Sequence, residues 1–402
     1  MTNVKVPQPN TAEEFVFEIC QRSFLSLWAY RNPKQQPLGD ELCDVLVVCD
    51  PHVLIFSVKD IGLKDAPEPV VGAKRWLRKA VEGSCKQIYG AESLIKSSKN
   101  VIRYDGSPGL PFPNPATIHR IAVAFGSQGK VSLPFGDFGK GFVHVFDERS
   151  TGILFGELNT ITDFVNYLRD KERFFLSATN TQFEGAEEDL LALYLHGGRE
   201  FPAGYDALLI GGNLWKEVQA KPEYKRKLTA DARSFVWDRL IDSFCRDALS
   251  NNLEFGPDLK GTERAIRTMA REHRFARRIL GKSFKVFLDS SHKIAARMTR
   301  SPSGVVYVFL AMPHGTPRNY RVADLGNRCF VARGLHRDAT TVVGIATEQY
   351  EKGKGFSLDL VHLYKPSWTA EDQARVEAMQ REFGYFASPL TTVEHEDEYP
   401  TN

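Results

Sequence analysis

Two apolar segments separated by a tight turn constrain the fold more than any other part of the sequence. Residues 42–49 and 53–59 are rich in β-branched residues, and Asp50-Pro51-His52 separates them. Two short runs of this kind around an Asp-Pro turn predict a β-hairpin. The first run is apolar on both faces, which is typical of a strand at the centre of a sheet.

The segments around this hairpin predict a mixed α/β domain that ends near residue 175. Apolar residues recur at helical spacing over Thr11 to Arg22 and Lys74 to Lys96, so both segments are expected to be helices. A Gly- and Pro-rich loop is expected from Asp105 to Pro115. The expected strands are Phe24 to Tyr30, Leu42 to Cys49, Val53 to Lys59, Ile118 to Phe125 and Phe142 to Phe146. The predicted order is therefore α, β, β, β, α, β, with one further strand.

The second half changes character after an expected linker at residues 177–185, and it predicts an α+β domain over residues 186–402. The expected helices are Glu187 to His196, Asp231 to Leu249, Thr262 to Leu280 and Thr369 to Phe383, the last opened by a capping pattern. The expected strands are Val305 to Met312, Cys329 to Ala332, Thr341 to Ile345 and Leu358 to Tyr364. The role of this domain stays open between a sensor and a nucleic-acid-binding module.

Composition excludes few classes of function. The 402 residues have a formal net charge of +2, which neither requires nor forbids a polyanionic partner. No signal-peptide-like segment or long apolar run occurs, so a cytoplasmic protein without a membrane partner is expected. The six scattered cysteines contain no CxxC pair and favour buried, reduced thiols. The ten histidines lack the spacing of a structural zinc site.

A carboxylate inside the first hairpin strand carries most of the chemical information. Asp44 shares a face with Leu46 in an otherwise apolar segment, where burial is costly unless the acid is paired or binds a metal. If the turn is centred near Pro51, paired residue numbers sum to 102 or 103, and Asp44 lies beside residue 58 or Lys59. Ser57 then shares a face with Lys59. A structural ion pair explains the same spacing equally well.

This pattern resembles a known family. A helix bearing Glu, a strand Asp, a Lys fifteen residues later at the end of the next strand, and then a basic helix resemble the PD-(D/E)xK nuclease superfamily, most closely its restriction-endonuclease-like branch. The resemblance covers residues 11–130. It implies an α/β fold in which an N-terminal restriction-endonuclease-like αβββαβ core, within residues 1–176, precedes the C-terminal α+β domain. It also implies a metal-dependent endonuclease that hydrolyses DNA, with RNA as the less expected substrate.

The resemblance assigns roles to individual residues. Asp44 would bind Mg²⁺ or Mn²⁺, which prefer hard oxygen ligands, and Lys59 would be the catalytic lysine. Ser57 stands where the family usually has an acid, two residues before the lysine, so the site is either completed by another carboxylate or weakened. Glu41 could substitute if the strand end twists, whereas Asp60 is expected to point to the opposite face.

The two flanking helices supply further candidates. The family often uses a carboxylate of the first helix on the metal, which makes Glu14 and Glu18 candidate ligands. Each has an alternative role, because Glu14 fits a capping box with Thr11 and Glu18 fits a helical salt bridge with Arg22. Gln87 of the second helix is a candidate catalytic residue near the phosphate.

Two sets of basic residues are candidate nucleic-acid contacts. The first set lies on the second helix and comprises Arg75, Arg78 and Lys86. The second recurs at spacings of three and four residues, as on one helix face, and comprises Arg267, Arg271, Arg274 and Arg278. Such side chains could follow a phosphate backbone, and an ordinary solvated or oligomer-facing surface explains them equally well.

These observations leave three function classes open. The leading prediction is a metal-dependent nuclease, and the domain arrangement suggests an effector of bacterial anti-phage defence. The main alternative is an inactive nuclease-like fold that binds nucleic acid or acts as a scaffold. The third is a structural interaction protein in which Asp44 and Lys59 form only an ion pair. A homo-oligomer or a defence-system partner protein is compatible with each of them.

Overall fold

The computed structural model describes residues 11–35, 39–64, 67–177, 181–250, 259–289, 295–349, 351–387 and 396–399. It is a mixed α/β structure, as predicted, and it divides into two compact units, Met1–Lys221 and Pro222–Asn402. The linker expected at residues 177–185 therefore lies within the first unit, where β9 (Thr181–Phe183) occupies part of it. Residues 178–180 of that linker lie outside the described residues.

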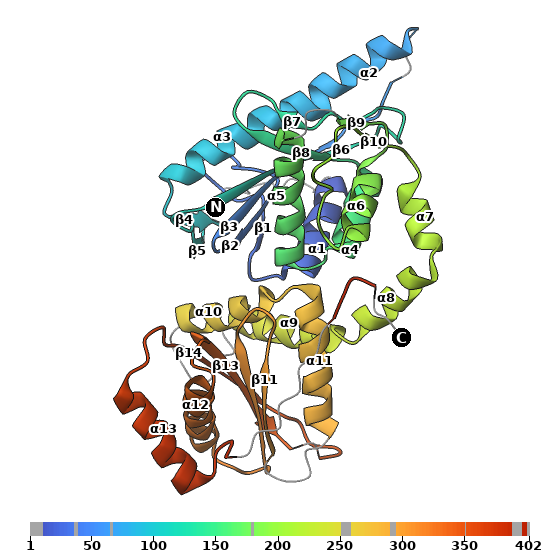
Figure 1. Ribbon diagram of the computed structural model, residues 1–402. Coiled ribbons are helices and arrows are strands. Elements are labelled where there is room, and N and C mark those ends of the chain that lie inside the picture. Colours follow the sequence, from blue (N-terminus) through green and yellow to red (C-terminus); the bar gives the residue numbers. More distant parts are fainter. Residues whose placement is uncertain are drawn as a thin grey trace. The chain divides into compact units, whose positions relative to one another are not determined.

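A six-stranded mixed sheet forms the centre of the N-terminal unit (Figure 1). Its strands, in spatial order, are β1 (Ala29–Arg31), β2 (Val45–Cys49), β3 (His52–Asp60), β6 (Thr117–Phe125), β8 (Phe142–Phe146) and β7 (Gly136–Asp137). The first three strands pair antiparallel, and β3, β6 and β8 are parallel. The predicted hairpin of β2 and β3 is confirmed, but its register differs slightly. Val45 pairs with Phe56, so paired numbers sum to 101.

Helices cover both faces of this sheet. The helices of the unit are α1 (Thr11–Phe24), α2 (Pro69–Leu77), α3 (Gly83–Ser97), α4 (Glu148–Glu157), α5 (Ile161–Ser177), α6 (Glu187–His196) and α7 (Leu214–Ala220). A π-helical turn, Arg78–Glu82, joins α2 to α3. Two small sheets complete the unit, one of β4 (Asn100–Ile102) with β5 (Pro108–Pro111) and one of β9 with β10 (Leu208–Ile210).

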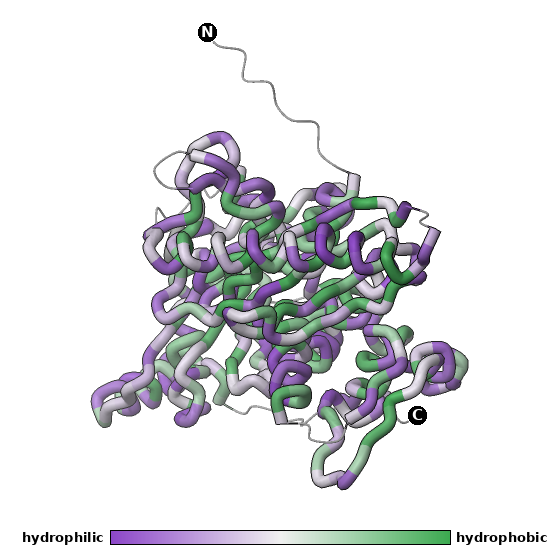
Figure 2. The backbone as a smooth tube through the Cα atoms, turned by 90° about the horizontal axis from the view of Figure 1, so that it is seen from above, coloured by the Kyte–Doolittle hydropathy of each residue, from purple (hydrophilic) through white to green (hydrophobic). Residues whose placement is uncertain are grey.

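The two faces of the central sheet are both apolar, as the sequence predicts for a central strand. Leu46 and Ile55 pack on the side of α2 and α3. On the opposite side, Phe56 contacts Phe155 of α4, which in turn contacts Phe24 of α1. Figure 2 shows the matching pattern in the helices, whose turns alternate between hydrophilic and hydrophobic residues. Side chains on both faces of the hairpin are therefore buried. Asp44 lies at the open end of this hairpin.

The C-terminal unit contains a four-stranded sheet in the order β11 (Ala295–Arg300), β12 (Val306–Met312), β13 (Thr341–Glu348) and β14 (Leu358–Tyr364). Only β12 and β13 pair in parallel. The helices are α8 (Pro222–Ala232), α9 (Phe235–Leu249), α10 (Leu259–Ala270), α11 (Arg274–Asp289), α12 (Arg318–Leu335) and α13 (Ala370–Phe383). Alternate residues of β12 face opposite layers, because Leu310 packs against α12 whereas Phe309 contacts Trp237 of α9.

The structure corrects several expected elements. Only residues 29 and 30 of the strand expected from Phe24 to Tyr30 lie in a strand, because α1 continues to Phe24. Residues 329–332 lie inside α12 and form no strand, since a four-residue apolar run does not distinguish a strand from a buried helix segment. The helices expected over 231–249 and 262–280 are each interrupted, near Ser234 and before Arg274.

Two simpler expectations can also be compared with the structure. All six cysteines are free and buried. Among the described residues, no helix is both long enough and apolar enough to cross a membrane.

Candidate active site at the open end of the hairpin

Asp44 and Lys59 lie together at the open end of the β2–β3 hairpin. Oδ2 of Asp44 accepts a 2.5 Å hydrogen bond from the backbone N–H of Val58, and Nζ of Lys59 lies 3.8 Å from the same oxygen. The Asp44 residue is only 9% exposed, whereas a quarter of the Lys59 side chain is exposed. The register therefore brings an acid and an amine together, as the sequence predicts, with the amine reaching towards solvent.

Glu41 joins this pair because the chain before β2 folds back on residues 32–34. Leu42 N–H donates to the Pro33 carbonyl at 2.7 Å, and Lys34 forms an antiparallel bridge with Glu41. Nδ2 of Asn32 then donates to Oε2 of Glu41 at 3.0 Å. Glu41, which the sequence suggested as a substitute for an acid at position 57, thus lies beside Asp44.

Asn32 is a site residue that sequence reasoning missed. Its backbone has a φ of 44°, in the left-handed region that Asn tolerates better than most residues. Its backbone N–H donates to the Asp44 carbonyl at 3.0 Å. Its side-chain Oδ1 is buried and has no hydrogen-bond partner among the described residues. A buried amide oxygen without a partner is unusual and is suited to accept a proton donor or a hard cation.

The acids of the site perturb one another. Desolvation, followed by the charge of Asp44 and a hydrogen bond with it, raises the pKa of Glu41 to about 7. Desolvation and the charge of Asp44 also raise the pKa of Glu13, while Lys59 and Arg31 oppose this change. Protons or cations therefore stabilise this group of carboxylates.

The first helix contributes Glu13, not the two residues that the sequence singled out. Glu14 and Glu18 are exposed on α1, and neither is among the charged groups that perturb Asp44, Glu41 or Glu13. Adjacent helical residues are separated by about 100° around the axis, so a shift of one position changes which side chain faces the site. The Thr11–Glu14 spacing gave no signal for Glu13.

Ser57 and Gln87 form a contact of their own beside this group. The Ser57 side chain is buried, and its Oγ donates a 2.7 Å hydrogen bond to Oε1 of Gln87 on α3. The sequence proposed both residues for the site, and the structure brings them together. Their hydrogen bond ties the end of β3 to the helix that follows it.

The two predicted sets of basic residues differ in their exposure to solvent. Arg75, Arg78 and Lys86 are exposed on the segment from α2 to α3, and none forms an ion pair with a described residue. The π-helical turn that contains Arg78 lies in the same segment, and such turns are frequent near functional sites.

The arginines of the C-terminal unit do not form the single exposed helix face that their spacing suggested. Arg267 and Arg271 are separated from Arg274 and Arg278 by the break between α10 and α11, and Arg267 lies 3.5 Å from Glu263. Arg274 and Arg278 are 1% and 0% exposed.

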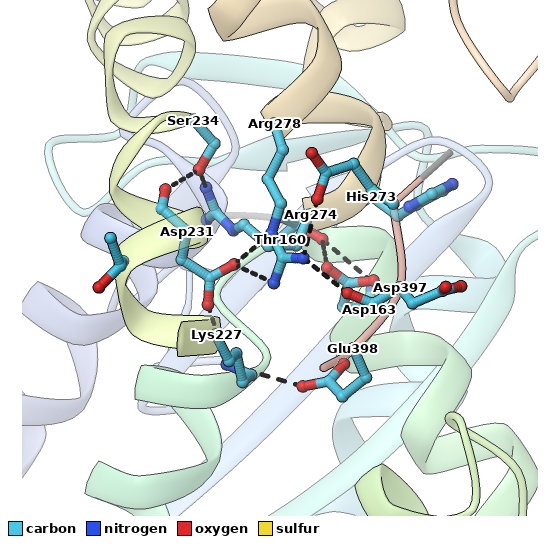
Figure 3. Close-up of polar contacts among 12 residues, drawn as sticks. Thr160, Asp163, Lys227, Asp231, Ser234, His273, Arg274, Arg278, Asp397 and Glu398 are labelled. Atoms are coloured by element: carbon cyan, nitrogen blue, oxygen red, sulfur yellow. Dashed lines mark hydrogen bonds and ion pairs between the residues drawn. The ribbon is translucent and has the colours of Figure 1, made fainter. Parts of the chain in front are cut away.

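Acidic partners explain this burial. Nη1 of Arg274 lies 2.7 Å from Asp238. Nη2 of Arg278 lies 2.8 Å from Asp231, which also accepts from Lys227 (Figure 3). Spacings of three and four residues describe a helix face equally well whether it is solvated or buried in ion pairs. These two arginines are therefore part of the interior of the C-terminal unit.

The donor set around Asp44 is the natural place to test for a metal. Among the described residues, no group of three or more His, Cys, Asp and Glu side chains is gathered closely enough to hold an ion. The available ligands are the carboxylates of Asp44 and Glu41 and the unpartnered amide oxygen of Asn32, with Glu13 nearby. All are hard oxygen donors, which Mg²⁺ and Mn²⁺ prefer.

Comparisons with known proteins add no assignment to this site. No protein-family model, no curated protein and no solved structure matches the chain.

Proposed function

We propose that the N-terminal unit is a metal-dependent endonuclease that hydrolyses phosphodiester bonds of DNA. The observation that carries this proposal is the group formed by Asp44, Lys59 and Glu41. A buried carboxylate lies 3.8 Å from a partly exposed amine, and desolvation, together with the charge of Asp44, raises the pKa of the second carboxylate, Glu41, to about 7. An ordinary ion pair needs no second acid, whereas a divalent cation requires more than one oxygen ligand.

The chain order of the unit supports the same proposal. From α1 through β1, β2 and β3 to α3 and β6, the elements follow the αβββαβ order of the PD-(D/E)xK family that the sequence resembles. The resemblance expects the acid on the strand before the turn and the lysine at the end of the next strand. Asp44 immediately precedes β2, which begins later than the strand expected from Leu42, and Lys59 is the second-last residue of β3.

Each residue has a physical role in the proposed reaction. Asp44 and Glu41 would hold the cation, with Asn32 completing the oxygen ligands and Glu13 adding negative charge. A bound Mg²⁺ or Mn²⁺ lowers the pKa of water and neutralises charge on the phosphate. Lys59, which is held by Asp44 and open to solvent, can orient the attacking water or stabilise the charge that develops on the phosphate oxygens.

The exposed basic side chains of α2 and α3 support DNA as the substrate. Arg75, Arg78 and Lys86 lie on the segment that also supplies Gln87, the partner of Ser57. Contacts from Arg and Lys to phosphates position a nucleic acid without reading its sequence. This segment is thus suited to bring the backbone of DNA towards Asp44 and Lys59.

A second function is favoured by one observation. Ser57 occupies the position where the family usually has an acid, and its hydroxyl is already used in the hydrogen bond to Gln87. A site that has lost this ligand could bind nucleic acid or serve as a scaffold without cleaving it. Metal-dependent cleavage separates the two functions.

The test is nicking of supercoiled plasmid by the full chain in Mg²⁺ or Mn²⁺. We expect cleavage by the wild type, and a loss of at least 100-fold in Asp44→Asn and Lys59→Met. Asp60→Asn is the matched control, because Asp60 is exposed at the end of the same strand and should retain activity. Salt-dependent DNA binding without cleavage by the wild type would favour the inactive module, and equal activity in all variants would refute the proposed site.

A further inference from the structure

The C-terminal unit contains a cavity that the proposed nuclease reaction does not use. Its volume is about 690 Å³, within the range of small-molecule sites. It lies where β13 ends, at Thr347 to Gln349, and where the chain has just left the neighbouring parallel strand β12, at His314. Ligands in α/β proteins commonly bind outside the carboxyl ends of parallel strands. Helices α9 and α11 form the opposite wall.

The wall of the cavity is mainly apolar. The apolar side chains come from both helices, from the loop before β14 and from the first residue of β14, and they include Leu240, Phe284, Leu288, Phe356 and Leu358. Phe356 is 73% exposed, an unusual state for a large aromatic side chain at the edge of a cavity. A molecule that buries apolar surface here would gain roughly 25 cal/mol for each Å² removed from water.

One polar group inside the wall lacks a partner. The backbone N–H of Gln349 donates to the Met312 carbonyl at 2.8 Å, which fixes this residue at the end of β13. Its side-chain Nε2 is buried and has no hydrogen-bond partner among the described residues. A buried amide donor without an acceptor is costly, so a ligand that supplies an acceptor would remove that cost.

The charges around the cavity do not favour an ion. The acids are already neutralised, because Glu348 lies 2.6 Å from Arg321 and Glu351 lies 2.8 Å from Lys354. Arg239 and Asp289 are exposed and of opposite sign. The lining therefore presents no uniform field of either sign that would hold a strongly charged molecule.

We propose that this cavity binds an uncharged, largely apolar small molecule that carries a hydrogen-bond acceptor, such as a carbonyl oxygen or a ring nitrogen. The acceptor receives the Nε2–H of Gln349, and the apolar body lies between Leu240 and Phe284 on one side and Phe356 on the other. This site is separate in chemistry from the proposed nuclease site, and it does not depend on nuclease activity. It gives the C-terminal unit a ligand-binding role.

The test uses Nile red, an uncharged planar dye with a ring carbonyl whose fluorescence rises in apolar surroundings. We expect the full chain to bind it saturably at one site. Gln349→Glu removes the amide donor and adds a charge, and Leu288→Trp fills part of the cavity from a partly exposed position. Each should weaken binding at least tenfold. Gln219→Glu makes the same chemical change at an exposed position outside the cavity and should bind like the wild type.

Three outcomes would overturn the proposal. The first is the absence of saturable Nile red binding by the wild type. The second is unchanged affinity in both cavity variants, provided that their thermal unfolding shows that they are folded. The third is equal affinity at the same site for the anionic dye 1-anilinonaphthalene-8-sulfonate, which would contradict the choice of an uncharged ligand.

Discussion

The hydroxyl of Ser57 donates a 2.7 Å hydrogen bond to Oε1 of Gln87. This contact joins the end of β3, two residues before Lys59, to α3, which belongs to the same segment as the exposed basic residues. In the family that the sequence resembles, an acid usually stands at this position and binds the metal. Here the position serves packing between strand and helix, and Glu41 is the carboxylate that neighbours Asp44.

Ser57→Ala tests this assignment. The substitution removes one partly buried hydrogen bond, and the exposed Gln87 can bond to water instead, so we expect the free energy of unfolding to fall by about 1 kcal/mol. Mn²⁺ affinity should not change, because Ser57 is not a ligand. Urea unfolding and calorimetric titration with Mn²⁺ measure the two effects. Ser97→Ala, which removes an exposed hydrogen bond on the same helix, is the control, and a large loss of Mn²⁺ affinity in Ser57→Ala alone would contradict the assignment.

Binding of a divalent cation should stabilise the protein by mass action. At a free Mn²⁺ concentration of 100 times Kd, the expected gain is about 2.7 kcal/mol. Asp44→Asn and Glu41→Gln should each lose most of this gain, because each removes a charged oxygen ligand, whereas Asp60→Asn should retain it. Thermal unfolding with and without Mn²⁺ measures the gain. Stabilisation that persists in both ligand variants would mean that the cation binds elsewhere.

The exposed basic residues of α2 and α3 should determine how DNA affinity depends on salt. Each phosphate contact contributes about −0.9 to the slope of log K against log salt concentration. Replacing Arg75, Arg78 and Lys86 by Gln should therefore make the slope less negative by up to about 2.7, without preference for sequence. Fluorescence anisotropy with a labelled duplex over a salt series measures this. Exposed Arg173→Gln on α5 is a matched control, and an unchanged slope in the triple variant would remove this surface from the proposal.

Arg278 should stabilise the folded C-terminal unit, unlike the exposed basic residues that are proposed to contact DNA. Its guanidinium is fully buried and lies 2.8 Å from Asp231, so Arg278→Leu leaves this buried carboxylate with Lys227 as its remaining cationic partner. Breaking a buried ion pair in this way costs roughly 3–5 kcal/mol. Arg78→Leu, at an exposed position, should change stability by less than about 0.5 kcal/mol. Chemical unfolding of the two variants compares them, and a small effect of Arg278→Leu would show that the ion pair contributes little.

The hairpin shows how much of the fold the sequence determines. Strands β2 and β3 were predictable because two short apolar runs around an Asp-Pro turn favour a hairpin, and the proximity of Asp44 and Lys59 followed from the turn. The register was off by one or two residues, since sequence alone does not reveal which residues the turn includes. Residues 329–332 were misassigned because Leu325 and Cys329 pack as one face of a buried helix, which a short window does not reveal.

The rest of the site depended on tertiary contacts. Asn32 has a positive φ and lies in a loop that folds back on the residues before β2. No local sequence motif predicts such a contact. Glu13 replaces Glu14 because the orientation of α1 is set by packing of its apolar face. The arginines of α11 were predicted to face solvent, although their partners Asp231 and Asp238 lie about 40 residues earlier in the chain.

Burial of His119 should make the N-terminal unit less stable as the pH is lowered. Its Nε2 lies 3.1 Å from Nδ1 of His52, and desolvation is the largest cause that lowers its pKa to about 3, below its ordinary value of 6.5. The charged and titratable groups that act on it are Arg120 on its own strand β6, His52 on β3 and Arg169 on α5, while His144 on β8 is itself perturbed by it.

The sign of the effect follows from proton binding. Between pH 6.5 and pH 3 the unfolded chain holds a proton on this residue and the folded chain does not, so stability falls as the pH is lowered through this range, by at most about 1.4 kcal/mol per pH unit. His119→Gln should reduce this loss but not abolish it, because burial also keeps the pKa of His144 well below its ordinary value. Unfolding by urea at pH values from 7 to 4 measures the slope, with exposed His196→Gln as control. An identical slope in wild type and His119→Gln would show that His119 is protonated in the folded protein as readily as in the unfolded chain.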